Sequence, residues 1–110
     1  MSEITLEQVH AAMIELARGK YADTCFAIYD EQVDGEWVPQ CEVNHAAIEM
    51  SGYGAEVLQA LCPWVDGDAD MVTPTMSCGQ WETLWRTAYI QLDWSMLAYE
   101  YLIDYENGNV

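Results

Sequence analysis

Positive charge is what this sequence lacks most. Three lysine and arginine residues stand against 19 aspartates and glutamates, so the formal net charge is −16. Proteins that bind DNA or RNA directly need cationic side chains on the phosphates, and this scarcity argues against that function. A net charge of magnitude about 2–8 already serves the solubility of a small domain, and a larger one adds self-repulsion. We therefore expect the negative charge itself to serve the function.

Long hydrophobic runs are also missing. No stretch approaches the roughly 20 apolar residues of a membrane span. The opening Met1-Ser2-Glu3-Ile4 has neither the basic nor the apolar region of a signal peptide, which predicts a cytoplasmic protein. In that compartment four cysteines are expected as reduced thiols buried like small hydrophobic residues, and these are Cys25, Cys41, Cys62 and Cys78.

Closely spaced ligand pairs for zinc are absent. Cys41 and His45 have the spacing of half a site, but the sequence holds no Cys-x-x-Cys, and successive cysteines are 16, 21 and 16 residues apart. Structural zinc sites usually have two close pairs. We expect no zinc here.

The short acidic segment from Asp66 through Asp68 to Asp70 imitates the first half of a calcium-binding loop. Counted from Asp66, such a loop needs glycine at the sixth place and glutamate at the twelfth, where this chain has Met71 and Ser77. We expect a solvated acidic loop, and no cofactor.

Catalytic motifs are lacking as well. There is no Gly-x-Ser-x-Gly nucleophile elbow, and only His10 and His45 can supply an imidazole base. Nineteen carboxylates always allow an acid–base pair to be drawn, so their presence discriminates nothing. We expect a protein that is not an enzyme.

Apolar residues, in contrast, are plentiful. They make up 52% of the chain and include five tryptophans and seven tyrosines, which argues against intrinsic disorder despite the charge. A chain of 110 residues is predicted to form a single domain, residues 1–110.

The first predicted element is an amphipathic helix over residues 5–19. Thr5 and Gln8 have capping-box spacing, and Gly19 stands where the helix would stop. Arg18 and Lys20 lie at its C-terminal end, where the helix dipole favours cations. Two of the three basic residues thus have a structural explanation.

A β-hairpin is predicted over residues 25–43. Asp34-Gly35 between two segments rich in β-forming residues is a strong hairpin pattern, although residues 21–32 also show helical spacing. A two-residue loop pairs Gln32 with Trp37, and further along the ladder Ile28 with Cys41 and Phe26 with Val43. Pro39 would suit the edge of a sheet.

A middle helix and a loop are predicted next. Asn44 can cap a helix over residues 45–61, which the glycines of Ser51-Gly52-Tyr53-Gly54 would kink or split and Pro63 would end. Residues 63–77 are interpreted as a loop.

The last predicted element is a long C-terminal helix that begins at the capping box of Ser77 and Gln80. Its apolar residues form two lines, which indicates a central helix or a helix at a subunit interface, and so allows a homodimer. Its polar stripe consists of Glu82, Arg86, Asp93, Glu100 and Asp104. The predicted fold is α+β and predominantly helical, with an N-terminal helix, one hairpin, a middle helix and a long C-terminal helix.

Four functions are compatible with so acidic a domain. The chain can imitate a polyanion such as DNA and block a nucleic-acid-binding protein, neutralise a basic toxin as an immunity protein or antitoxin, fold in a salt-rich cytosol, or serve as a structural or accessory subunit. The first explains the charge most directly.

In size, excess of acids, scarce lysine and its aromatic and acidic segment TLWRTAYIQLDWSMLAYEYLIDYE, the chain resembles the small acidic inhibitors of bacteriophages and mobile elements, the antirestriction and anti-CRISPR proteins. The resemblance implies stoichiometric binding to the basic, nucleic-acid-binding groove of a host defence complex. The expected partner is therefore a basic protein or complex rather than nucleic acid or a membrane.

Carboxylates exposed in clusters are the candidate contacts to that partner. They are Asp30, Glu31, Asp34 and Glu36 at the hairpin tip, Asp66, Asp68 and Asp70 in the loop, and Glu82, Asp93, Glu100 and Asp104 on the last helix.

Overall fold

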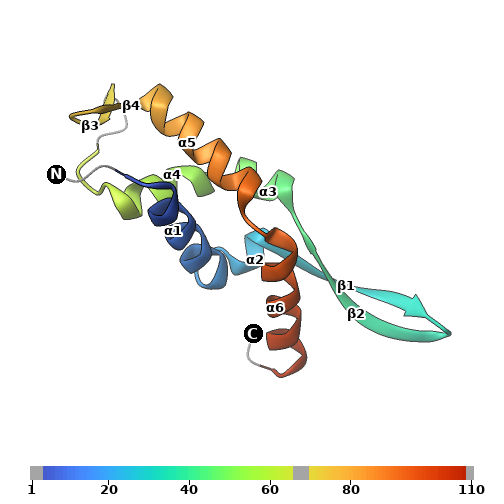
Figure 1. The fold of residues 1–110 in the computed structure, drawn as a ribbon. Helices are drawn as coiled ribbons and strands as arrows, with labels where there is room; N and C mark the ends of the chain where they lie inside the picture. The colour runs from blue at the N-terminus through green and yellow to red at the C-terminus, as the bar shows by residue number, and fades with distance from the viewer. Residues whose placement is uncertain (1–3, 66–69, 109–110) are drawn as a thin grey trace. The chain divides into compact units, whose positions relative to one another are not determined.

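The computed structural model describes residues 4–65 and 70–108, and within these ranges the chain forms six helices and two antiparallel two-stranded sheets (Figure 1). The elements are α1 (Leu6–Arg18), α2 (Ala22–Cys25), β1 (Phe26–Val33), β2 (Glu36–Val43), α3 (His45–Met50), α4 (Tyr53–Leu61), β3 (Met71–Thr73), β4 (Met76–Ser77), α5 (Cys78–Gln91) and α6 (Trp94–Glu106). The predicted α+β, mainly helical class is confirmed.

The contacts of the chain divide it into two compact units. Unit 1 comprises the described residues of 1–15 and 52–92, and unit 2 those of 16–51 and 93–110. A single domain over residues 1–110 stays a prediction. None of the helices in the described part of the chain is long and apolar enough to cross a membrane.

Unit 1 is built on the N-terminal part of α1 together with α4 and α5. The predicted capping box starts α1: the Thr5 N–H donates to Gln8 Oε1 at 2.9 Å, and the Gln8 N–H donates to Thr5 Oγ1 at 3.2 Å. The side chains that form the core of this unit are Val9, Met13, Tyr53, Val57, Cys62, Val72, Trp81 and Ala88.

Two aromatic residues hold α4 in this core. The buried hydroxyl of Tyr53 donates to the carbonyl of Met13 on α1, and the Tyr53 ring lies 5.7 Å from the ring of Trp85 on α5. A Cβ at Gly54 would come within 3.0 Å of the Trp85 indole. The glycine is therefore needed for the close approach of α4 and the indole.

The prediction of a loop over residues 63–77 is wrong for its second half. Met71–Thr73 and Met76–Ser77 pair as the small hairpin β3–β4, with Val72 and Thr73 buried. The indole N–H of Trp64 donates to the Val72 carbonyl at 3.0 Å, which attaches this hairpin to the preceding turn. Strands of three and two residues are too short to show an alternating pattern.

Unit 2 contains the β1–β2 hairpin in the predicted register. Phe26 lies opposite Val43 and Gln32 opposite Trp37, and the ladder extends to the pair Val33 and Glu36. Asp34 and Gly35 both have positive φ, 52° and 85°, as the two-residue type I′ turn requires.

A short helix before the hairpin, α2, has no counterpart in the predicted element order.

The middle helix is divided, as the sequence predicted. Asn44 caps α3 by accepting the Ala47 N–H at 3.1 Å. Gly52, with φ of 78°, separates α3 from α4.

A C-terminal helix is present, but the prediction that it is one long helix is wrong. Leu92 has extended backbone angles, and the Asp93 side chain accepts the Met96 N–H at 3.0 Å, so that α5 ends and α6 begins there. Asp93 is an N-cap, a role that competes with its place in a polar stripe. The predicted stripe is consequently divided: Glu82 and Arg86 are on α5 in unit 1, and Glu100 and Asp104 are on α6 in unit 2.

Helix α6 packs against the base of the hairpin. Leu97 and Ala98 are buried, and the Tyr101 ring lies 5.2 Å from that of Phe26 at the start of β1. The Tyr101 hydroxyl donates to Asp23 Oδ1 of α2 at 3.2 Å. Tyr101 thus contacts both the first residue of β1 and the preceding helix α2, while the strand continues away from α6 (Figure 1).

Replacing the buried phenol of Tyr53 tests the first of these contacts. Tyr53→Phe keeps the ring and removes the hydrogen bond to Met13, and we expect the free energy of unfolding to fall by about 1 kcal/mol. Chemical denaturation measures it. The matched control is Tyr99→Phe, at a residue that is 63% exposed, which we expect to change stability by less than about 0.5 kcal/mol. Equal effects would contradict the assigned role of Tyr53.

Burial of Cys25 predicts a loss of stability in alkali. Desolvation raises the pKa of this thiol from 9.0 to about 11. Below pH 9 the folded and unfolded chains both hold the proton; above it the unfolded chain loses the proton first, so stability falls as the pH approaches 11. We expect this decline, measured by denaturation from pH 8 to 11, to be up to about 2 kcal/mol smaller in Cys25→Ala. Parallel pH profiles would contradict the prediction.

Candidate partner-binding surface

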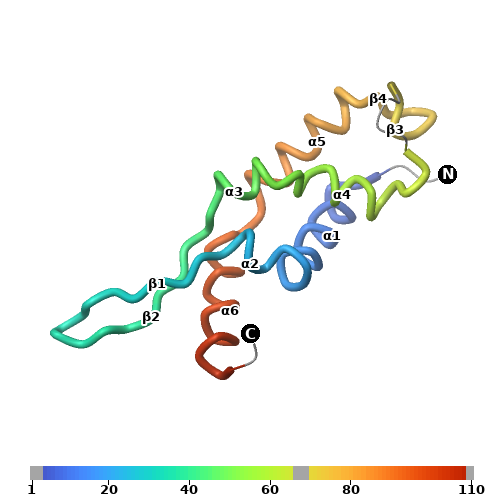
Figure 2. Tube along the Cα trace, turned by 180° about the vertical axis from the view of Figure 1, so that it is seen from behind, coloured from blue at the N-terminus to red at the C-terminus, as the bar shows by residue number. Residues whose placement is uncertain are grey.

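The outer half of the β1–β2 hairpin is the most open part of unit 2. Every side chain from residue 29 to residue 37 is exposed, and the turn lies at the end of the hairpin far from α6 (Figures 1 and 2). Three of these side chains are large and apolar: Trp37 is 69% exposed, Tyr29 44% and Val33 43%. Tyr29 and Val33 lie on one face of the ribbon and Trp37 on the other, so that both faces offer exposed apolar surface to a partner.

The four hairpin acids predicted from the sequence surround these apolar side chains. Side chains alternate along a strand, so Glu31 and Glu36 lie on the face of Tyr29 and Val33, and Asp30 lies on the opposite face with Trp37. The fourth acid, Asp34, is in the turn itself. The structure therefore brings Asp30, Glu31, Asp34 and Glu36 together, and it distributes them over both faces of the hairpin.

The density of charge on the hairpin can be compared with that of DNA. Two strands of eight residues make a ribbon about 26 Å long at about 3.3 Å per residue. Its acids are Asp30, Glu31, Asp34, Glu36 and Glu42, or one charge per about 5 Å, against one per about 1.7 Å in duplex DNA. The hairpin alone does not reproduce a duplex. It offers a few separated carboxylates with one exposed aromatic side chain on each face, Tyr29 on one and Trp37 on the other.

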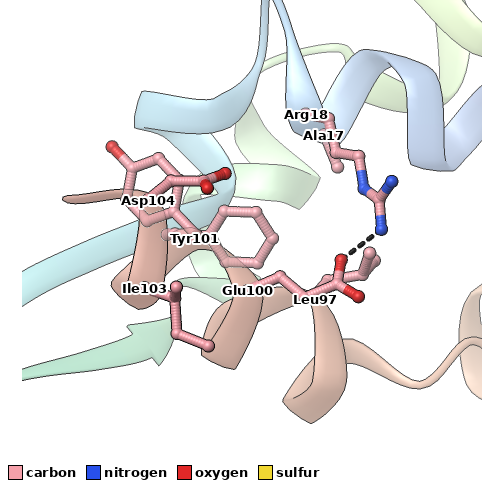
Figure 3. A pocket seen from close by; sticks show the side chains of 8 residues that line it. Ala17, Arg18, Leu97, Glu100, Tyr101, Ile103 and Asp104 are labelled. Carbon is pink, nitrogen blue, oxygen red and sulfur yellow. Dashed lines mark hydrogen bonds and ion pairs between the residues drawn. The ribbon is translucent and has the colours of Figure 1, made fainter. Parts of the chain in front are cut away.

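Two further candidates, Glu100 and Asp104, line a cleft of about 410 Å³ between α6, the last turn of α1 and the start of β1 (Figure 3). The carboxylate of Glu100 forms an ion pair with the guanidinium of Arg18. Both side chains remain about half exposed, so the pair contributes little to stability. Asp104 lies on the same side of the cleft and brings a second carboxylate to it.

A hydrogen bond across 78 residues in sequence supports this cleft. The Tyr101 hydroxyl contacts Asp23, and burial, followed by this bond and the charge of Asp23, raises the pKa of the Tyr101 phenol. The proton therefore stays on the phenol as the donor. No local pattern in the sequence indicated this contact, because α2 and α6 are far apart in the chain.

The remaining candidates have different surroundings. Asp93 caps α6, and Glu82 forms an ion pair with Arg86 one turn away at 3.2 Å. Asp70 is exposed just before β3, in unit 1. Asp66 and Asp68 lie outside the described residues. The candidate acids that share unit 2 are therefore Asp30, Glu31, Asp34, Glu36, Asp93, Glu100 and Asp104.

Unit 2 also carries most of the net charge. Its residue ranges contain eleven negative charges and two positive ones, Arg18 and Lys20, a formal charge of −9. Arg18 is paired with Glu100, and the Lys20 ammonium lies 5.7 Å from the centre of the Tyr21 ring. No cation lies in the sequence between residues 21 and 51, so the hairpin acids have no basic neighbour on their own strands.

One face of α6 is apolar and exposed, but it differs from the predicted one. The sequence predicted a second apolar line through Ile90, Trp94, Leu97, Tyr101 and Tyr105. Trp94 and Leu97 are buried, whereas Ile90, which lies on α5, and Tyr105 are exposed. Three other exposed apolar side chains of α6, Met96, Tyr99 and Ile103, share a face of the helix. A homodimer through this helix stays a prediction.

Within residues 4–65 and 70–108, no group of three or more His, Cys, Asp and Glu side chains is placed to hold a metal ion. Of the cysteines, Cys25 and Cys62 are buried, Cys41 is half-buried and Cys78 is exposed.

Comparison with known proteins gives no family. No protein-family model matches the sequence, and neither a curated protein nor a solved structure is significantly similar to it.

Asp93 allows the structural and the binding roles of an acid to be separated. Asparagine caps a helix as well as aspartate does, whereas alanine does not. We expect Asp93→Ala to lower the free energy of unfolding by about 1 kcal/mol, and Asp93→Asn to leave it nearly unchanged. Thermal or denaturant unfolding of both variants gives the result. If Asp93→Asn is as destabilising as Asp93→Ala, the charge rather than the cap matters at this position.

Proposed function

We propose that the protein is a non-catalytic inhibitor that binds a basic, nucleic-acid-binding surface of a host defence protein or complex. The β1–β2 hairpin is its main contact, and Glu100 and Asp104 of α6 extend the surface. The observation that carries the proposal is the outer half of the hairpin, where four acids, three exposed apolar side chains and no cation occupy residues 29–37.

The composition of this hairpin suits an interface with a cationic protein. Interfaces are commonly anchored by a few aromatic side chains, with tryptophan prominent among them, and are ringed by polar groups. Trp37 supplies such an anchor with Asp30 on its own face, and Glu31 and Glu36 lie on the other face beside Tyr29 and Val33. The acids attract lysine and arginine over a distance, and the apolar side chains bury surface on contact.

The charge spacing bears on the mode of inhibition. One carboxylate per about 5 Å along the hairpin is too sparse to replace duplex DNA over its whole length. We infer a block of selected cationic residues in a groove that normally holds phosphates. Displacement by nucleic acid is then still expected, because both ligands use the same cations.

Capture from a bacterial lysate tests the function. The purified protein serves as bait at low and at high salt, with and without competing duplex DNA, and mass spectrometry identifies what is retained. We expect a DNA- or RNA-guided complex, or another nucleic-acid-binding protein, that both DNA and salt release. A partner that DNA does not displace would contradict the proposal and favour an immunity protein, an antitoxin or an assembly subunit.

Neutral replacements locate the contact surface on the captured partner. The hairpin variant carries Asp30→Asn, Glu31→Gln, Asp34→Asn and Glu36→Gln, and the control variant carries Glu7→Gln, Glu15→Gln, Glu49→Gln and Glu106→Gln at four exposed acids elsewhere. Both lose the same charge. We expect the hairpin variant to bind at least about tenfold more weakly, and the control to lose less than about threefold. Equal losses would show a response to net charge alone and contradict the hairpin as the contact.

A further inference from the structure

The two outer edges of the hairpin differ in what their backbone can bond. A two-residue type I′ turn makes the flanking pair, Val33 and Glu36, a hydrogen-bonded pair, and such pairs alternate along an antiparallel ladder with non-hydrogen-bonded ones. Asp30 and Pro39 are then a non-hydrogen-bonded pair, whose backbone groups point away from the hairpin.

Proline makes the edge of β2 a poor template for another strand. Pro39 has no N–H, so the row of outward donors along β2 is broken in its middle. On β1 the outward groups belong to Ile28, Asp30 and Gln32, and each has both an N–H and a carbonyl. In residues 4–65 and 70–108, no backbone hydrogen bond from another element reaches these three residues.

We propose that the β1 edge takes up an extended, basic segment of the partner as a third strand, from Ile28 to Gln32. This inference rests on the proposed function in taking the partner to be basic. An added antiparallel strand exchanges two hydrogen bonds with each outward residue, and so about six with these three. Unpaired edges of exposed strands are known templates for such additions.

Charge selects the occupant of the edge. An added strand lies about 4.8 Å from β1, which places its side chains next to Asp30 on one face and next to Glu31 on the other. Lysine or arginine at those positions meets opposite charge. A second copy of β1 would instead bring acids against acids, which is unfavourable for directly opposed residues.

The pair of variants Asp30→Pro and Asp30→Ala tests the edge separately from the charge. Both remove the same carboxylate. Only proline also removes an outward N–H and places its ring on the edge, in the position that Pro39 already occupies across the ladder. The probe is a capped octapeptide in which pairs of lysines alternate with pairs of valines, so that both faces of the added strand carry lysine. Its binding is followed by calorimetry, and the comparison peptide carries N-methyl groups on alternate amides.

We expect Asp30→Pro to weaken binding of the octapeptide about tenfold or more, since several edge hydrogen bonds are lost, and Asp30→Ala to weaken it less than about fivefold. N-methylation of the peptide should weaken its binding to the wild-type protein as strongly. Amide exchange of the wild-type protein should slow at Ile28, Asp30 and Gln32 when the peptide is added, a readout that does not depend on how well the proline variant folds.

Three results would overturn the inference. The first is an equal loss of peptide affinity in the proline and alanine variants, and the second is undiminished binding of the N-methylated peptide. The third is a wrong pattern of amide exchange: the peptide slows exchange at other residues, or exchange at Ile28, Asp30 and Gln32 slows without peptide as the protein concentration rises. The last would indicate pairing with a second copy. If Asp30→Pro still captures a DNA-displaceable partner from lysate as well as Asp30→Ala does, the edge inference fails while the proposed function stands. If the peptide results hold and no such partner exists, the function fails instead.

Discussion

The left-handed turn at Asp34 and Gly35 is the constraint on which the geometry of the hairpin depends. With φ of 52° and 85° these two residues close a two-residue loop, and such a loop permits one register only. That register decides which acids share a face, places Trp37 opposite Gln32 and sets Pro39 at a position where its missing N–H breaks no bond of the ladder. A shift by one residue would exchange the two faces and put proline at a hydrogen-bonding position.

Local chemistry explains most of what the sequence predicted correctly. Asp34-Gly35 with its flanking strands, the capping boxes at Thr5 and Ser77, and the left-handed Gly52 each depend on residues within a few positions of one another. The division between α5 and α6 was missed because the apolar pattern continues through Leu92. The capping ability of Asp93 gave the competing indication, and in the structure the cap prevails.

The candidate surface was only partly predictable for the same reason. The four hairpin acids are exposed near one another, as the pattern implied. The pairing of Glu100 with Arg18 and the bond from Tyr101 to Asp23 join segments about 80 residues apart, and no periodicity records such contacts. They form when α6 packs on the hairpin base, so they follow from tertiary structure alone.

Pro39 has a consequence for the behaviour of the chain in a crowded cell. An exposed ribbon with two open edges can recruit strand after strand and grow into a fibril. Here one side is closed by proline, so growth would stop after a single addition, and like charges along the other side oppose copies of the chain itself. A long, exposed hairpin is thereby compatible with a monodisperse protein, because only one of its two edges can pair with another strand.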